Sequence, residues 1–282
     1  MTPSVKKCLQ ASHEIGLDRL DAQILLLHAL QKPTHDRAWL LSHDTDTIMP
    51  AQQQNFDRLI ERRLAGEPVA YLVGSKAFFG LNLAVTADVL VPRPDTECLV
   101  DWALACMVAS DAPSVLDLGT GSGAIGLAIK HNHSNANVTL VDASQAALDV
   151  ALGNAASLGL VGIGLRGLQS NWFERVPADD RFDLIVSNPP YIADGDSHLA
   201  ALVHEPLMAL TSGADGLNAI RQIIHDAPRY LKSGGWLLLE HGFDQAAAVR
   251  ELLLDRGFEQ VTSRLDLNGI ERCSGGTLKS AF

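Results

Sequence analysis

The sequence lacks the cysteine patterns of a disulfide framework and of a zinc site. Its four cysteines, Cys8, Cys98, Cys106 and Cys273, are scattered and form no Cys-x-x-Cys pair, which fits reduced, structural thiols. No apolar run approaches the length of a membrane span, about 18 residues, and the N-terminus shows no basic-then-apolar signal. We therefore expect a cytoplasmic protein without a membrane partner.

Clusters of basic residues are also missing. The chain carries 22 Lys and Arg against 33 Asp and Glu, a formal net charge of −11. Residues 1–85 contain 9 basic and 9 acidic side chains, so the excess falls on residues 86–282, with 13 basic and 24 acidic ones. Because tight DNA binding relies on clustered Lys and Arg that neutralise phosphates, this distribution favours a protein partner and argues against direct nucleic acid binding.

The sequence shows no motif for a metal or for a covalent nucleophile. It contains no His-Glu-x-x-His, no Asp-rich calcium loop and no recognisable setting for a catalytic serine or cysteine. We interpret the acidic and histidine side chains of residues 194–206 as those of a solvated loop and expect no metal. The whole segment from Tyr191 to Gly216 is long enough to form a lid over a substrate.

The chain divides into a helical part and an alternating part. Residues 1–75 read as helices, among them 18–29 and 51–64, the second opened by Pro50. Residues 76–92 form a linker with a hairpin predicted over 78–85 and 89–91. From 93 to 282 strands alternate with helices, which argues for an α/β fold with a mostly parallel sheet covered on both faces. The strands are predicted at 114–118, 138–142, 163–168, 182–187, 236–240, 261–266 and in the last residues, with helices at 124–130 and 144–158.

A glycine-rich turn, Gly119-Thr120-Gly121-Ser122-Gly123, joins a buried strand to a helix. Glycines let the backbone turn tightly and approach a ligand closely, while the first helical N–H groups attract negative charge. About 20 residues later a second strand ends in Asp142, the expected place for a carboxylate that accepts hydrogen bonds from ribose hydroxyls. A nucleoside cofactor is implied. The glycines alone leave a nicotinamide site, or a plain tight turn, equally open.

The tetrapeptide Asn188-Pro189-Pro190-Tyr191 follows the strand predicted over 182–187. An amide or exocyclic nitrogen is a poor nucleophile, so an enzyme that methylates it must hold both N–H bonds and aim the nitrogen. An asparagine oxygen and a proline carbonyl can accept these bonds, the two prolines stiffen the turn, and Tyr191 can stack on the flat group. Asn-Pro also begins ordinary turns. Paired with the glycine-rich turn, however, the tetrapeptide favours a methyltransferase over a hydride-transfer enzyme.

Over nearly its whole length the sequence resembles the PrmC or HemK family, the glutamine-N5 methyltransferases that modify class I peptide chain release factors. The resemblance is carried by seven ordered stretches, 91–97, 117–125, 141–144, 187–192, 204–206, 213–217 and 239–242. It implies S-adenosylmethionine as cofactor, with S-adenosylhomocysteine as product. It also implies the class I methyltransferase fold, a Rossmann-like seven-stranded sheet with a reversed final strand, preceded by a small N-terminal helical bundle.

The resemblance assigns roles to individual residues. Gly119 to Gly123 would line the methionine end of the cofactor, Asp142 would hold the ribose, and Trp172 would lie near the adenine. Asn188 would serve both cofactor and substrate, and Pro189, Pro190 and Tyr191 would contact the substrate glutamine. The catalytic set is thus expected to be Asn188, Pro189 and Tyr191, and the partner a class I release factor with its Gly-Gly-Gln loop.

Several readings stay open at this point. Residues 1–75 are interpreted as the domain that recognises the partner protein, with a plain stabilising cap as the alternative. Asp95 or Thr96 is predicted to cap a helix, in a segment that by resemblance also borders the active site. His241 is expected to brace the sheet. An adenine-N6 methyltransferase of DNA or RNA would use the same amide clamp, and a non-catalytic translation accessory protein could bind S-adenosylmethionine without turnover.

Overall fold

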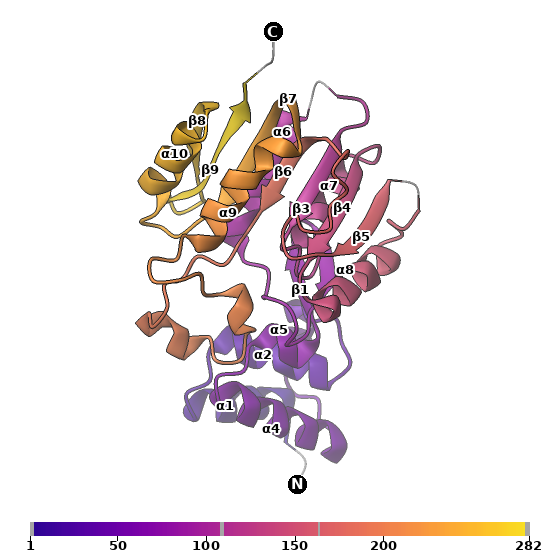
Figure 1. The fold of residues 1–282 in the computed structure, drawn as a ribbon. Coiled ribbons are helices and arrows are strands. Elements are labelled where there is room, and N and C mark those ends of the chain that lie inside the picture. The colour runs from indigo at the N-terminus through magenta and orange to yellow at the C-terminus, as the bar shows by residue number, and fades with distance from the viewer. Residues whose placement is uncertain (1–2, 108–109, 163, 280–282) are drawn as a thin grey trace. The chain divides into compact units, whose positions relative to one another are not determined.

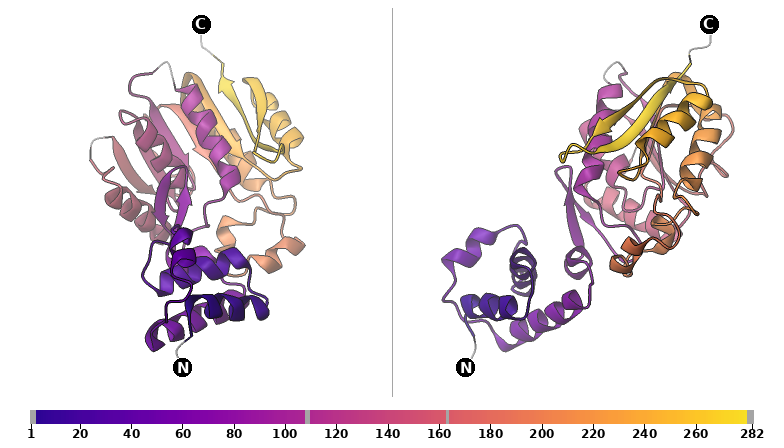
Figure 2. Two further views of the ribbon diagram at one scale, coloured as in Figure 1. Left: turned by 180° about the vertical axis from the view of Figure 1, so that it is seen from behind. Right: turned by 90° about the vertical axis from the view of Figure 1, so that its left-hand side faces the viewer.

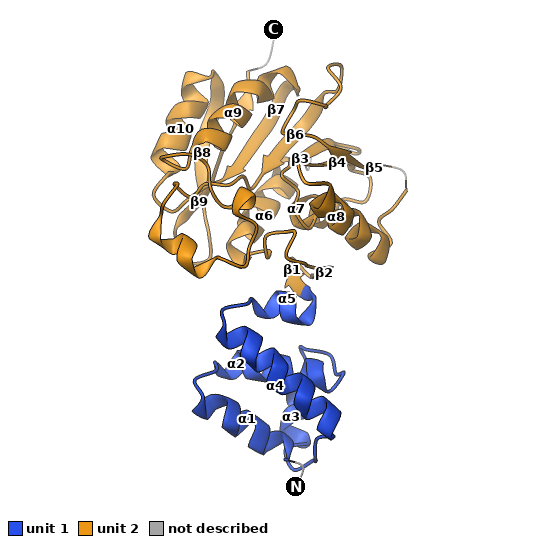
Figure 3. Cartoon of the chain, turned by 60° about the horizontal axis from the view of Figure 1, so that its bottom comes forward, with its two compact units in different colours: residues 1–75 blue, residues 76–282 orange. Residues whose placement is uncertain are grey.

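The computed structural model describes residues 3–107, 110–162 and 164–279. These residues form two compact units, 1–75 and 76–282 (Figure 3). The hairpin that the sequence assigns to a linker is therefore part of the second unit. No helix of the described residues is long and apolar enough to cross a membrane.

The first unit is built from helices around a core of its own. Asp18 caps α2, because its carboxylate accepts hydrogen bonds from the N–H groups of Leu20 and Asp21. Pro50 begins α4, where its missing N–H costs nothing. The core contains the fully buried leucines 25, 26 and 27 of α2 and Phe56 of α4. The helices are α1 (Val5–Glu14), α2 (Arg19–Ala29), α3 (Arg37–Ser42), α4 (Pro50–Leu64) and α5 (Val69–Val73).

The second unit contains a seven-stranded sheet of order β5-β4-β3-β6-β7-β9-β8 (Figure 1). The first five strands of this order are parallel, and β9 runs antiparallel to both of its neighbours. The mostly parallel sheet with a reversed final strand is thereby confirmed. The strands are β3 (Ser114–Leu118), β4 (Asn137–Asp142), β5 (Leu165–Gln169), β6 (Phe182–Ser187), β7 (Leu231–Glu240), β8 (Phe258–Leu265) and β9 (Glu271–Leu278).

Helices cover both faces of the sheet (Figures 1 and 2). On one face the buried side chains of α6 (Glu97–Cys106), α7 (Ala124–Asn132) and α8 (Gln145–Ser157) form one core with β3, β4 and β6. On the other face, α9 (Asn218–Asp226) and α10 (Ala246–Asp255) form a second core. Strands buried on both faces read as continuous apolar runs, which explains why their positions could be predicted.

Several predicted boundaries are wrong. The hairpin consists of β1 (Ser75–Phe78) and β2 (Leu81–Ala84), and residues 89–91 form no strand. Phe79 and Gly80 make a two-residue turn with φ of +47° and +78°. Turns with positive φ usually carry Asn, Asp or Gly, so an aromatic residue at the first position does not predict one. The strand predicted over 236–240 begins earlier, at Leu231, and that over 261–266 begins at Phe258. The predicted strand start at 163 and the chain end at 280–282 lie outside the described residues.

Candidate active site

Three parallel strands end at one edge of the sheet, and the predicted site residues follow them. Leu118 pairs with Val141 on one side and with Ser187 on the other. The next residues along the three strands are Gly119, Asp142 and Asn188. Register alone therefore brings together residues that are far apart in the sequence. In open α/β sheets this is the edge at which ligands bind.

A cavity of about 380 Å³ lies at this edge, within the size range of pockets for small molecules and cofactors. Among its lining residues are eight of the predicted site residues, Gly119, Thr120, Gly121, Ser122, Asp142, Trp172, Asn188 and Pro190. Gly123, Pro189 and Tyr191 do not line it. Gly123 occupies the N-cap of α7 with φ of +82°, which gives it a role in starting the helix.

A buried carboxylate that the sequence analysis did not single out organises the glycine-rich turn. Asp117 is fully buried at the end of β3 and accepts hydrogen bonds from the Thr120 hydroxyl at 2.6 Å and the Gly126 N–H at 3.0 Å. Its second oxygen, Oδ1, has no hydrogen-bond partner among the described residues. Burial raises the pKa of this carboxyl from 3.8 to about 6. An acidic residue inside an apolar strand pattern was the available signal.

Asp142 is held by backbone N–H groups of two segments that line the cavity. Its two oxygens accept hydrogen bonds from the Gly121 N–H and the Ser144 N–H, each at 2.9 Å. Burial raises the pKa of the Asp142 carboxyl, while the backbone hydrogen bonds lower it. Each carboxylate oxygen can accept a further bond, so the group can receive a diol from the cavity side.

The turn leaves room for a ligand where side chains would otherwise stand. Gly119 and Gly121 have φ of +70° and +54°, a region that favours glycine. A Cβ on Gly119 would lie 3.4 Å from Cζ3 of Trp172, whereas one on Gly121 would meet no described atom within 4 Å. Trp172 itself has φ of +48° and also packs against the second core. A bulky residue with positive φ has a strained backbone. Such strain is found most often at ligand and active sites.

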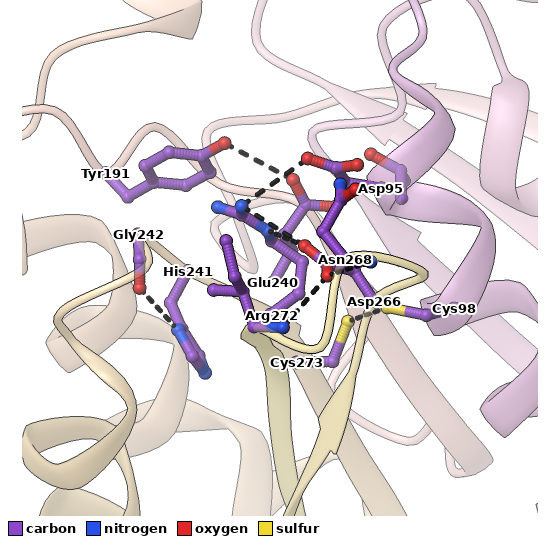
Figure 4. Close-up of polar contacts among 12 residues, drawn as sticks. Asp95, Cys98, Tyr191, Glu240, His241, Gly242, Asp266, Asn268, Arg272 and Cys273 are labelled. Atoms are coloured by element: carbon purple, nitrogen blue, oxygen red, sulfur yellow. Dashed lines mark hydrogen bonds and ion pairs between the residues drawn. The ribbon is translucent and has the colours of Figure 1, made fainter.

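The asparagine and tyrosine of the Asn-Pro-Pro-Tyr segment make different polar contacts. The Asn188 amide donates from Nδ2 to the Thr96 hydroxyl oxygen at 3.2 Å. Pro189 is buried. The Tyr191 hydroxyl donates to Oε1 of Glu240 at 3.3 Å (Figure 4), and burial, together with the nearby Glu240, raises the pKa of Tyr191 well above its usual value. Tyr191 thus faces a carboxyl group, and its stacking role stays a prediction.

The segment before α6 does not cap that helix with its side chains. Thr96 stands at the N-cap of α6 but makes no capping hydrogen bond, and neither does any side chain at η1 (Pro94–Thr96). The predicted N-cap position is thus confirmed for Thr96, although its side chain makes no capping hydrogen bond. The Thr96 hydroxyl contacts Asn188 instead, and Asp95 forms an ion pair with Arg272 at 3.4 Å.

The segment predicted as a lid is tied to the cavity by a buried glutamate. Glu205 accepts from the Val91 N–H at 3.2 Å and forms an ion pair with Arg93. Its side chain is only 3% exposed. Arg93 and the neighbouring Pro206 both line the cavity. Part of this segment is thus an anchored wall, which corrects its interpretation as a solvated loop.

His241 is fully buried, and its Nε2 lies 2.8 Å from the Ser274 hydroxyl of β9. It braces the sheet, as predicted, and burial lowers its pKa. Within residues 3–107, 110–162 and 164–279, no group of three or more His, Cys, Asp or Glu side chains is placed to hold a metal ion.

Two family models match parts of the chain. Residues 4–74 match the PrmC N-terminal domain, and residues 100–215 match the methyltransferase small domain. The second match contains the glycine-rich turn, Asp142 and the Asn-Pro-Pro-Tyr segment.

Two relatives resemble the chain over nearly its whole length, and a solved structure shares the fold of part of it. A release factor glutamine methyltransferase of Bordetella pertussis is 52% identical over 93% of this chain and 96% of its own. Another of Burkholderia pseudomallei is 49% identical over 98% of both. A 16S rRNA methyltransferase of T. thermophilus, solved with AdoMet and guanosine, shares the fold with a TM-score of 0.52 and 20% identity, over 73% of this chain and 50% of that one.

Proposed function

Because the chain belongs to the family of release factor glutamine methyltransferases, we propose that it transfers the methyl group of S-adenosylmethionine to the side-chain amide nitrogen of a release factor glutamine. The observation that carries this proposal is that Asn188, Asp142 and the glycine-rich turn line the same cavity. A methyltransferase needs both halves, a nucleoside site and a clamp for a planar nitrogen.

The described residues fit the cofactor. Gly119 and Gly121 have positive φ and no side chain, so the backbone of the turn is open to a ligand. Asp142 would accept hydrogen bonds from the ribose hydroxyls, and Trp172 would lie beside the adenine. The cavity volume and the position of Asp142 among the lining residues support this arrangement. When bound, S-adenosylmethionine supplies an electrophilic methyl group on a positively charged sulfur.

The Asn-Pro-Pro-Tyr segment would hold the substrate amide. Asn188 Oδ1 and the Pro189 carbonyl would each accept one N–H of the glutamine, with Pro190 and Tyr191 shaping the slot. Two acceptors hold the nitrogen in line with the methyl group and stabilise the positive charge that develops on it. As the N–C bond forms, the S–CH3 bond would break and S-adenosylhomocysteine would leave; the nitrogen would then lose one proton to water, so no strong base is required. A glutamate side chain would set oxygens against both acceptors and be rejected.

The helical unit would contribute recognition of the partner protein. Its match to the PrmC N-terminal domain supports a role particular to this family. The acidic balance of residues 86–282, with 13 basic and 24 acidic side chains, supports a protein substrate over nucleic acid. We propose that class I release factors, through their Gly-Gly-Gln loop, are the substrates.

The test is incubation of the protein with labelled S-adenosylmethionine and a purified class I release factor. We expect one labelled methyl group on the loop glutamine, located by mass spectrometry of the loop peptide. A release factor with the loop glutamine changed to alanine is the control and should remain unlabelled. Label in DNA or RNA adenine with none in the release factor would overturn the proposal.

A further inference from the structure

Glu240 ends β7 directly beside the Asn-Pro-Pro-Tyr segment. In the parallel pair of β6 and β7, Ser187 lies opposite Leu239, so Asn188 and Glu240 are the next residues along the two strands. The Glu240 side chain is buried, at 1% exposure. Burying a carboxyl group costs free energy unless the group is paired. A protein that retains a poorly paired one is therefore expected to use it. One of its oxygens, Oε2, has no hydrogen-bond partner within the part of the chain that the structure describes.

Two side chains of the Asn-Pro-Pro-Tyr segment are connected to the Glu240 carboxyl group. Tyr191 donates its hydroxyl to Oε1 at 3.3 Å (Figure 4). Asn188 donates from Nδ2 to Oγ1 of Thr96 at 3.2 Å, and the Thr96 hydroxyl lies close enough to Glu240 to lower the pKa of its carboxyl group. Both ends of the tetrapeptide are therefore connected to Glu240, one directly and one through Thr96.

We propose that Glu240 is a positioning residue for methyl transfer, which sets the orientation of the Asn188 amide through the Thr96 hydroxyl. This inference rests on the proposed function and adds to it the residues that aim the clamp. Neither Thr96 nor Glu240 needs to touch the substrate amide for this role.

The direction of the hydrogen bonds follows from the chemistry of the groups. An ionised carboxylate only accepts, so it takes the single hydroxyl proton of Thr96. The Thr96 oxygen is then left as an acceptor, and it selects the NH2 group of Asn188. Oδ1 of Asn188 would then be free to accept an N–H of the substrate, since Asn188 lines the cavity. A protonated Glu240 could instead donate to Thr96, which would free the hydroxyl to bind Oδ1 and turn the amide round.

The surroundings keep Glu240 close to the point of ionisation. Burial raises its pKa from 4.5 to about 7, while Thr96, Arg272 and Tyr191 lower it and Asp95 raises it further. Arg272 is itself held by Asp266 at 3.3 Å and by Asp95 at 3.4 Å. The titratable or charged groups that act on this carboxyl, or on which it acts, are Asp95, Tyr191, Arg272 and Cys273.

The experiment measures kcat for methylation of a purified release factor from about pH 5.5 to 8.5, in the full-length protein and in E240Q. We call the proposed series of contacts from Glu240 through Thr96 to Asn188 the relay. We expect kcat of the parent protein to fall as the pH drops below about 7, because protonation of Glu240 disrupts this relay. Glutamine keeps the size of the side chain but presents either an oxygen or an NH2 group. The E240Q variant should therefore lose about tenfold in kcat above neutrality and show no acid limb.

A second pair of variants tests the relay without touching the carboxyl. T96S keeps the hydroxyl and should retain kcat within about threefold, whereas T96V should lose about 10- to 100-fold. Combining E240Q with T96V should cost no more than T96V alone, because both act on one chain of bonds. T277V is the matched control. It removes the hydroxyl of another buried threonine, which bonds to the Glu259 carbonyl at 3.3 Å, and should leave kcat unchanged.

The outcomes separate this inference from the proposed function. Affinity for S-adenosylhomocysteine, measured by calorimetry, should stay within about threefold in all variants, since Asp142 and the glycine-rich turn are intact. A parent protein that transfers methyl groups, with E240Q and T96V matching its kcat and its acid limb, would overturn the relay alone. A parent protein that methylates no release factor would overturn the proposed function, and the relay with it.

Discussion

At the scale of single residues, the site depends on two fully buried carboxyl groups, those of Asp117 and Glu240, and on the half-buried carboxyl group of Asp142. Asp117 shapes the glycine-rich turn, Asp142 joins two loops, and Glu240 faces the Asn-Pro-Pro-Tyr segment. Asp142 was predictable because it follows a strand at a fixed distance from the glycines. The acid within an apolar run marks Asp117 and Glu240 as unusual positions, but their contacts were not predictable, because the run does not indicate what the side chain will meet.

Replacing Asp142 by alanine should weaken binding of S-adenosylhomocysteine about 10- to 100-fold, because a hydrogen bond to a charged group contributes roughly 1.5–3 kcal/mol. Isothermal titration calorimetry gives the affinity. D149A, which removes an exposed carboxylate from α8, is the control and should bind normally. An unchanged affinity in D142A would refute the ribose role of this carboxylate.

Glu240 should also affect stability in a pH-dependent way. Its folded-state pKa of about 7 lies above the ordinary 4.5, so its contribution is fully favourable below about pH 4.5 and is lost as the pH rises through 7. E240Q removes this dependence. The free energy of unfolding of E240Q relative to the parent should therefore rise by about 2–3 kcal/mol between pH 5 and pH 8. Urea unfolding at several pH values measures this, and a difference that does not vary with pH contradicts the assignment.

At the scale of elements, the packing of α7 on β3 and β4 fixes the turn between them. A Cβ on Gly126 would come within 2.4 Å of Leu140 Cδ2 and 2.9 Å of Asp117 Oδ2. The helix can approach the strands closely because residue 126 has no side chain. Gly153 on α8 is a useful contrast, since a Cβ there would meet no described atom within 4 Å.

We expect Gly126→Ala to destabilise the protein by about 1–3 kcal/mol, because the overpacked methyl pushes α7 from the sheet. Gly153→Ala should stabilise it by roughly 0.5–1 kcal/mol, as alanine does in an exposed helix. Thermal unfolding of the two variants gives the sign of each change. Gly126→Ala with unaltered stability would mean that the contact between α7 and β4 is looser than described.

The elements themselves were largely predictable from sequence. The parallel strands were found because burial on both faces gives uninterrupted apolar stretches, and β6 was placed at its true ends, Phe182 and Ser187. The hairpin was misplaced because Phe79 adopts a positive φ that its side chain does not favour. Contacts between segments far apart in the sequence, such as the ion pair of Arg272 with Asp95, depend on the tertiary fold, which sequence periodicity does not specify.

At the scale of the whole molecule, the charge balance favours a protein glutamine over a nucleic acid adenine as the group held by the Asn-Pro-Pro-Tyr clamp. The chain has a net charge of −11, all of it carried by residues 86–282. Phosphate backbones are repelled by such a surface unless a basic groove compensates. A tenfold mass excess of duplex DNA should therefore leave the rate of release factor methylation unchanged. Strong inhibition at low salt, relieved by added salt, would reveal a basic groove and contradict this view.

The role of Asn188 as an acceptor for the substrate amide is tested most simply by the rate of methyl transfer in Asn188→Ala. The single-turnover rate with labelled cofactor and a release factor should fall at least about 100-fold, because one of the two acceptors for the amide N–H bonds is gone. Asn132→Ala, which removes a side chain bonded to the Ala128 carbonyl at 2.9 Å in α7, should keep the parent rate. A folded Asn188→Ala protein that transfers methyl groups at the full rate would contradict the clamp on which the account depends.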